Sequence, residues 1–361
     1  MKNLISRFLL MSSLSIAVTG TGRAEDIDIF SGVSAASGSV PQILFVIDSR
    51  SSNDASVSPY TCPVTIPAAD GKMLGMLQCA LYMAINSISS QPALLGNLRI
   101  GLMHGGSSSN KYGEMMRPSS SPWTMQLMDN SGITSWKTFL TDPNTNIKSS
   151  GNSPMGSMMQ EAWAFYTGHT GGSGTTYTAH LGGTTTCQKT YIVLIGNVDP
   201  THTSSNDAGG DFADLLAAIP TPTAAQQQQI NTSSVGPNTG QDGSTIDEWA
   251  RYLHQTDFGS QDDSQTITTY AIGAYGSDGL WLDKSQQMKS AALQGGGQYF
   301  LANTLDGFVG AIVQIFNEVA AVNSVFASSS LPVSANWRVR YASTPTSAPM
   351  AESVRVNAPS P

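Results

Sequence analysis

The sequence predicts an α/β fold: a doubly wound, mostly parallel sheet with helices on both faces. The first support is the apolar run at 43–47, which lacks polar alternation and is therefore typical of a strand buried on both faces. The same pattern returns at 191–195. The second support is the order of the patterns. Helical segments separate the strands, and alternating strands and helices imply right-handed crossovers in a parallel sheet.

The individual elements follow from the same reading along the chain. Strands are expected at 43–47, 98–103, 191–195, 266–272 and 298–301. Helices are expected at 73–88, 131–140, 155–166, 211–218, 244–255, 280–293 and 304–321. Loops are expected at 49–70, 105–122, 168–186 and 199–210, with a polar insertion at 220–243. In the helix at 155–166 the methionines recur at helical spacing, which favours a core face over a binding groove.

The two ends of the chain have their own patterns. Basic residues precede a short apolar run at 8–18, and small residues lead to Ala24, so residues 1–24 are expected to be a signal peptide and the protein to be exported. Residues 25–40 are expected to be an exposed lead-in and 41–323 the folded domain with insertions. The Ser-, Pro- and Ala-rich stretch 324–361 is expected to be a poorly ordered tail. No later segment is long and apolar enough to predict a membrane span.

The charge balance excludes one class of partner. The net charge is -8 and the pI is about 5.0, with charged residues making up 12% of the chain. Nucleic-acid binding needs a basic stripe that neutralises phosphates, and the sequence contains none.

Three cysteines, Cys62, Cys79 and Cys187, lie in a chain expected to be exported, where disulfides persist. A short loop with Pro and Gly separates the first two. We therefore predict a disulfide between Cys62 and Cys79, with Cys187 unpaired. Closing a loop of that length contributes about 3 kcal/mol in the chain-entropy model.

Polar residues follow the strand at 43–47 in a pattern that resembles the von Willebrand factor A domain. That family holds a divalent cation with Asp-x-Ser-x-Ser after the first strand, a Thr from a second loop and an Asp from a third. Here Asp48 and Ser52 match the first and last positions of the motif, and Ser153 matches the Thr. Oxygen ligands of this kind suit Mg²⁺ or Ca²⁺.

Two positions depart from that adhesion-site pattern. Arg50 stands where the middle Ser belongs, and a guanidinium repels a divalent cation. Asn197 stands where the Asp belongs. The preferred interpretation is a degenerate site held by hydrogen bonds. The alternative, a site that still binds metal with Asp199 as a substitute ligand, stays open.

A closer resemblance covers nearly the whole chain after residue 24. It is similar to the amino-terminal half of the PilC/PilY family of type IV pilus adhesin and biogenesis proteins. The matching segments are DIDIF at 26–30, the strand at 43–48, QCALY at 78–82, SWK at 135–137, MQEAWAFY at 159–166, CQK at 187–189, IGN at 195–197, GGGQYF at 295–300, IFNEV at 315–319 and AVNS at 321–324. That family continues into a carboxy-terminal β-propeller with a calcium loop, and no series of strands for one is expected before Pro361.

The expected function is a non-catalytic binding or assembly module of a type IV pilus tip adhesin or biogenesis protein, acting in pilus assembly, surface attachment or twitching motility. The sequence lacks the common nucleophile, zinc-protease and phosphate-loop motifs, so no enzymatic activity is expected. The resemblance implies minor pilins or other pilus components as partners, together with a host or surface ligand. It places the protein in the periplasm, the outer membrane or at the pilus tip. Two alternatives are a stand-alone exported metal-dependent adhesin and a truncated product without its propeller.

Overall fold

The computed structural model describes residues 40–49, 56–66, 71–105, 112–143, 147, 155–181, 188–196, 246–259, 264–274 and 286–328. The predicted signal peptide, the lead-in up to residue 39, the helix at 211–218 and the tail beyond residue 328 lie outside these residues. Within the described part, no helix is both long enough and apolar enough to cross a membrane.

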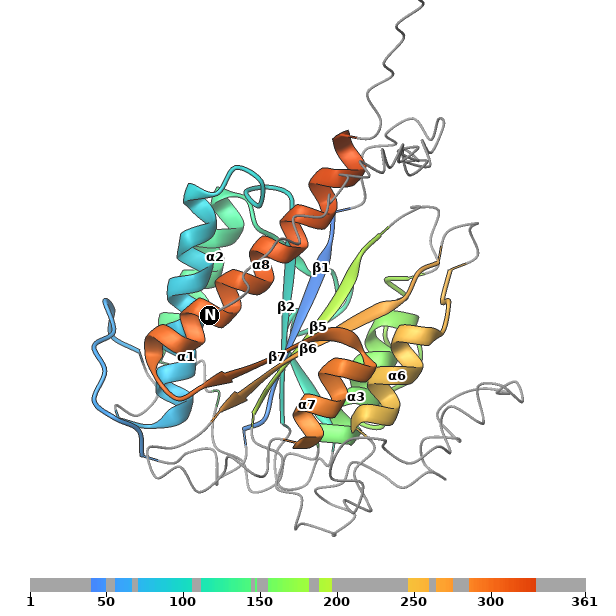
Figure 1. Ribbon diagram of the computed structural model, residues 1–361, viewed down its shortest axis with the longest axis horizontal. Helices are drawn as coiled ribbons and strands as arrows, with labels where there is room; N and C mark the ends of the chain where they lie inside the picture. Colours follow the sequence, from blue (N-terminus) through green and yellow to red (C-terminus); the bar gives the residue numbers. More distant parts are fainter. Residues whose placement is uncertain are drawn as a thin grey trace, which may run out of the picture. The chain divides into compact units, whose positions relative to one another are not determined.

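The described strands form one seven-stranded sheet (Figure 1). They are β1 (Gln42–Ile47), β2 (Arg99–Gly105), β3 (Gly113–Arg117), β4 (Gln126–Leu127), β5 (Thr190–Gly196), β6 (Ile267–Ala274) and β7 (Gly296–Ala302). The order across the sheet is β3-β2-β1-β5-β6-β7, and β4 pairs with β2. The pairs among β1, β2, β5, β6 and β7 are parallel, whereas β3 and β4 run antiparallel to β2. This is the doubly wound, mostly parallel sheet that the sequence predicts.

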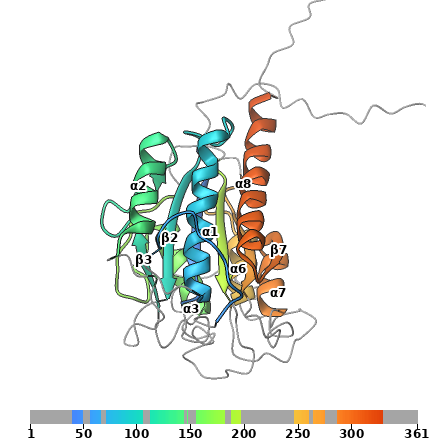
Figure 2. The same cartoon turned by 90° about the vertical axis from the view of Figure 1, so that its left-hand side faces the viewer.

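Helices cover both faces of the sheet. They are α1 (Met73–Ser87), the short 3-10 helix η2 (Ile88–Ser90), α2 (Asn130–Thr141), α3 (Met155–Thr167), α6 (Ile246–Gln255), α7 (Gln286–Gln294) and α8 (Leu305–Ser328). Figure 2 shows α1, α2 and α8 together in front of the sheet, while α3, α6 and α7 lie on the opposite face.

Strand β1 shows why the sheet needs two layers of helices. All six of its residues are buried, and successive side chains point to opposite faces. Phe45 packs in the core beneath α1, α2 and α8, whereas Leu44 and Val46 pack in the core beneath α3, α6 and α7. An uninterrupted apolar run is therefore what this position requires.

The methionine stripe of α3 is core, as the sequence favours. Residues 155–166 are all buried, and Met155, Met158 and Met159 pack in the cluster on that face of the sheet. Helix α2 begins at a side-chain cap, because Asp129 Oδ1 accepts a hydrogen bond from the Gly132 N–H at 2.7 Å.

The sequence reading missed two strands and ended the last helix too early. The expected loop at 105–122 contains β3, an edge strand that pairs antiparallel with β2, and β4 was also missed. The expected tail from residue 324 was placed too early, because α8 continues through Ser328.

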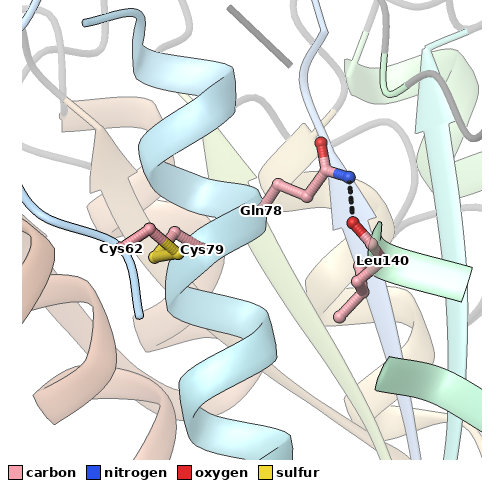
Figure 3. The surroundings of a disulfide bond; sticks show 4 residues. All are labelled: Cys62, Gln78, Cys79 and Leu140. Atoms are coloured by element: carbon pink, nitrogen blue, oxygen red, sulfur yellow. Dashed lines mark hydrogen bonds between the residues drawn. A yellow bond between two sulfur atoms is a disulfide. The ribbon is translucent and has the colours of Figure 1, made fainter. Parts of the chain in front are cut away.

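A disulfide joins Cys62 to Cys79, the pairing that the sequence predicts, with the two Cα atoms 5.9 Å apart. It fastens the segment before α1 to the buried middle of that helix (Figure 3). The neighbouring Gln78 side chain donates from Nε2 to the carbonyl oxygen of Leu140 in α2 at 2.6 Å. Two adjacent residues of α1 thus tie it to segments on both sides. Cys187 lies outside the described residues.

Candidate functional site

Strands β1, β2 and β5 end side by side, and the candidate site lies where they end. Ile47 is the last residue of β1, and its register partners are His104 in β2 and Ile195 in β5. The ladder continues one step further, because the Asp48 N–H donates to the carbonyl oxygen of Ile195 at 2.8 Å. Asp48 is therefore fixed by the sheet itself. The carboxyl ends of parallel strands are where open α/β sheets bind ligands.

The Asp48 side chain packs directly against Gly196, the last residue of β5. It is buried, with 1% of its surface exposed. A Cβ atom built on Gly196 would lie 2.3 Å from the Asp48 Cβ, far closer than two carbon atoms can approach. Glycine at 196 is thus required for the carboxylate to occupy this position.

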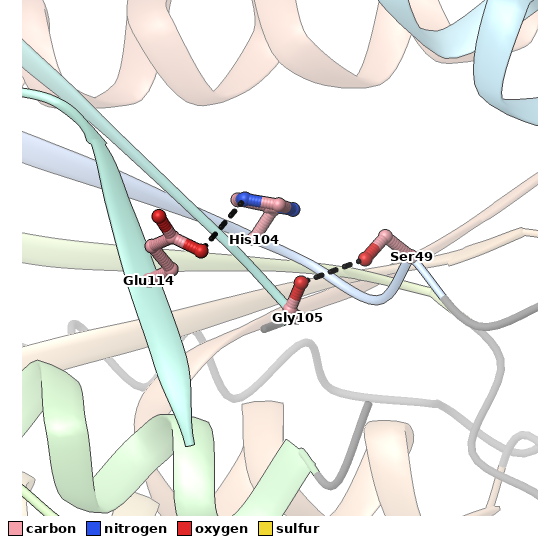
Figure 4. A network of polar contacts seen from close by, with 4 residues as sticks. All are labelled: Ser49, His104, Gly105 and Glu114. Carbon is pink, nitrogen blue, oxygen red and sulfur yellow. Dashed lines mark hydrogen bonds and ion pairs between the residues drawn. The ribbon is translucent and has the colours of Figure 1, made fainter. Parts of the chain in front are cut away.

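Ser49 connects the same edge to β2 (Figure 4). Its hydroxyl donates to the carbonyl oxygen of Gly105, the last residue of β2, at 3.2 Å, and Ser49 is fully buried. This bond ties the start of the loop that follows β1 to the neighbouring strand. The backbone around Asp48 is thereby held on both sides, by β5 and by β2.

His104 and Glu114 form the outer part of this edge (Figure 4). They are register partners in the antiparallel pair of β2 and β3, with Nε2 of His104 3.9 Å from Oε2 of Glu114. Burial lowers the pKa of His104, and the charge of Glu114 only partly opposes that effect. Since the burial effect is the larger, His104 is neutral at neutral pH and the contact is not an ion pair there. Glu114, at 61% exposure, presents a solvated carboxylate.

Only part of the predicted metal site falls within the described residues. Asp48 lies where the sequence predicts, at the end of β1. Its buried carboxylate fits the first ligand position of a hard-cation site. The other candidate residues lie outside the described part: Arg50, Ser52, Ser153, Asn197 and Asp199. The prediction of a degenerate adhesion site therefore stays a prediction.

Among the residues that the structure describes, no group of three or more His, Cys, Asp or Glu residues is arranged to hold a metal ion. One carboxylate does not make a hard-cation site, so no step of the function is assigned to a metal here.

A buried carboxylate that the sequence reading missed lies in α3. Glu161 is fully buried, and the loop that follows the helix folds back over it. Its Oε1 accepts from the hydroxyls of Ser173 and Tyr177, each at 2.6 Å, and its Oε2 accepts from the Ser173 N–H at 3.1 Å. Burial raises the Glu161 pKa, and these hydrogen bonds oppose that rise. Glu161 is an anchor for the loop.

Sequence signals for the missed residues differ in strength. A carboxylate in the middle of an apolar helix face, as at Glu161, signals a buried partner without saying which one. Gly196 closes an apolar run, and a glycine at a strand end signals a close approach. The Ser49 bond to Gly105 left no signal, because it depends on which strand lies beside β1.

No family model matches the chain, and neither does any curated protein. Among solved structures, it is similar to a point mutant of the PilB minor pilin from Streptococcus sanguinis, with 14% identity and a TM-score of 0.48 over 81% of this chain and 64% of that one. A von Willebrand factor type A structure from Catenulispora acidiphila has 10% identity and a TM-score of 0.40, over 78% of this chain and 43% of that one.

The open conformation of the pilus adhesin SpaC from Lactobacillus rhamnosus GG has 10% identity and a TM-score of 0.39, over 78% of this chain and 30% of that one. The chain spans less than two thirds of the length of each of these three proteins. Because each TM-score is below 0.5, we base the function on the chain's own residues and not on these neighbours.

Proposed function

We propose that this chain is a non-catalytic binding or assembly module of a type IV pilus tip adhesin or pilus-biogenesis protein, and that it binds its partners at the carboxyl edge of the sheet. The observation that carries the site is Asp48, a buried carboxylate fixed by the backbone bond to Ile195 and by packing against Gly196. A rigid strand end of this kind gives the loops beyond it a fixed base from which to bind.

The chemistry of the edge favours binding over catalysis. The Ser49 hydroxyl donates to the carbonyl oxygen of Gly105, a bond that fixes the start of the loop after β1. His104 is largely buried and contacts the exposed carboxylate of Glu114. These contacts hold the backbone of the edge in place, which supports the binding role proposed here.

The assignment to a pilus rests on the sequence resemblance to the PilC/PilY family, which runs in order from residue 26 to residue 324. The partners proposed are accordingly minor pilins and other pilus components, with the protein exported to the periplasm, the outer membrane or the pilus tip.

Deletion of the gene in the bacterium that encodes it tests this role. We expect loss of surface pili, of attachment or of twitching motility, restored by the wild-type gene. The Asp48→Ala variant is not expected to restore function, even when it is as abundant as the wild-type protein. The control is Ser89→Ala, a substitution at an exposed residue of η2, which is expected to restore function. Normal piliation, attachment and motility in the deletion strain would refute the proposal.

The second candidate is a stand-alone metal-dependent adhesin, which the buried carboxylate of Asp48 favours. Calorimetric titration of the exported chain with Mg²⁺, Ca²⁺ and Mn²⁺ separates the two. We expect a dissociation constant weaker than about 10 μM, the range of calcium sensor sites, because Arg50 and Asn197 replace ligands. Tighter binding that Asp48→Asn abolishes would favour the adhesin.

A further inference from the structure

Two acidic side chains are buried next to each other at the beginning of α6. Asp247 and Glu248 lie in the first turn of this helix, with 1% and 3% of their surfaces exposed. Helix α6 packs against α3, α7 and β6 (Figure 1). Burying a carboxylate is costly unless donors or an opposite charge compensate for the lost water. Each of the four carboxyl oxygens therefore needs a partner.

Helix α7 supplies donors to one of these oxygens. Oδ2 of Asp247 accepts from Oγ of Ser290 at 2.7 Å and from Nε2 of Gln294 at 3.0 Å. The Glu248 carboxyl group accepts from its own backbone N–H. Among the residues that the structure describes, no donor reaches Oδ1 of Asp247 or Oε2 of Glu248, and both atoms are buried. One oxygen of each carboxyl group is thus left without a donor.

The two side chains are close enough to share a proton, because Glu248 is within hydrogen-bonding reach of Asp247. Two carboxyl groups this close in a site without water cannot both ionise, so such a pair keeps one proton. If Oε2 of Glu248 carries that proton and donates it to Oδ1 of Asp247, both atoms gain a partner. The remaining negative charge lies on Asp247, where the helix dipole and the donors of α7 stabilise it.

The other charges near α6 do not replace this proton. The charged groups on α6 and on the elements packed against it are Arg251 and His254 in α6, Glu161 in α3 and Lys289 in α7. The tyrosines on these elements that keep their protons because burial raises their pKa are Tyr166, Tyr252 and Tyr270. Burial and the neighbouring Asp247 raise the pKa of Glu248 to about 9, and Arg251 only partly opposes them.

We propose that Asp247 and Glu248 share one buried proton, which stabilises the contact between α6 and α7 and makes it sensitive to alkaline pH. Loss of the proton would leave two adjacent negative charges in a buried layer. A metal cation is the competing occupant, with Oε1 of Gln294, which also lacks a donor among the described residues, as a third ligand. The first turn of a helix is the positive end of its dipole and repels a cation, so the proton fits better.

Carboxyl-carbon NMR of the full exported chain tests the proton directly. We expect the Glu248 signal to titrate with a midpoint of about 9. In Asp247→Asn the like charge is gone and the new amide can donate to the Glu248 carboxylate, so the midpoint is expected to fall by about one pH unit or more. A wild-type midpoint near 4.5 would overturn the proposal. A midpoint that Asp247→Asn leaves unchanged would show that the proton is not shared, which also overturns it.

Urea unfolding measures the link between this proton and stability. Because the Glu248 pKa is raised, the folded chain holds a proton that the unfolded chain has released, and stability falls as pH rises toward the folded pKa. In Glu248→Gln an amide replaces the protonated acid. The ratio of the wild-type unfolding constant to that of Glu248→Gln is therefore expected to rise about tenfold per pH unit between about pH 6 and 8.

The control for the unfolding measurement is Asp306→Asn, which removes an exposed carboxyl group in the first turn of α8 and is expected to keep the corresponding ratio constant. A constant ratio for Glu248→Gln as well would contradict the proposal. Repeating the measurement with about 10 mM Ca²⁺, Mg²⁺ or K⁺ separates a proton from a cation. Stabilisation by one of these ions that Glu248→Gln abolishes would assign the pair to a cation and overturn the shared proton.

Discussion

Replacing Glu161 by alanine is expected to destabilise the fold strongly, because the carboxylate anchors the loop after α3. The substitution removes three hydrogen bonds, two from the hydroxyls of Ser173 and Tyr177 and one from the Ser173 N–H. It leaves these donors, which belong to the loop itself, without this acceptor. Each such bond contributes about 1 kcal/mol net, so the loss of all three is expected to lower the free energy of unfolding by about 3 kcal/mol.

Urea unfolding, followed by tryptophan fluorescence, measures that loss. Glu161→Gln is the matched variant: it keeps one carbonyl oxygen for the two hydroxyls but loses the acceptor for the Ser173 N–H. We expect it to cost about 1 kcal/mol. Glu114→Ala, which removes a carboxylate that is 61% exposed, serves as the control and should change stability by less than about 0.5 kcal/mol. An Ala variant of Glu161 within 1 kcal/mol of the wild type would refute the anchor role.

The same carboxyl group gives stability a pH dependence with a definite sign. Burial raises the Glu161 pKa above 4.5, so in the folded state it keeps its proton at pH values where the unfolded chain has lost it. The stability from this group is therefore fully present below the unfolded pKa and is lost as pH rises through the folded pKa. In Glu161→Gln, this part of the dependence should disappear from unfolding measurements made across pH 4–8.

Three further substitutions test other parts of the structure. Gly196→Ala should lower the free energy of unfolding in urea by about 1–3 kcal/mol, because the added Cβ would press on Asp48. Gly310→Ala in α8, with open space around it, should be neutral or stabilising. Equal effects of the two substitutions would refute the close approach of Gly196 to Asp48. Replacing both Cys62 and Cys79 by serine should lower the free energy of unfolding by about 3 kcal/mol and make stability independent of reductant. A reductant effect that persists in this variant would indicate another disulfide. Since burial lowers the pKa of His104, its NMR titration should have a midpoint below 6.5. His104→Gln should reduce the loss of stability as pH falls below 6.5. A midpoint above 6.5 would mean that the charge of Glu114 outweighs the effect of burial.

The sequence predicts the central parallel strands β1 and β5 well, because each is buried on both faces. The runs at 43–47 and 191–195 are apolar at every position. A short run without polar alternation is typical of a strand that is covered on both faces. Strand β3 does not have such an apolar run. It is a short edge strand that contains Glu114 and Arg117 and is flanked by residues typical of loops, so its pairing with β2 decides its conformation.

The candidate site is predictable only in part, for a related reason. Asp48 ends a buried strand, so its place at the carboxyl edge follows from the chain itself. The contacts that fix it come from β5 and β2, which lie far away in sequence, and the strand order brings them together. The partners of Glu161 come from a Gly- and Thr-rich loop in which nothing marks Ser173 or Tyr177 as donors to a buried carboxylate.

The most direct test of the central claim is site-specific photo-crosslinking in cells that produce pili. A photoreactive amino acid at Glu114, exposed at the carboxyl edge beside the site, is compared with one at Ser89, exposed in η2. Mass spectrometry then identifies the captured proteins. We predict that minor pilins or other pilus components are captured from position 114 and not from position 89. Capture from both positions alike, or of no pilus component from position 114, would contradict the carboxyl edge as the binding surface.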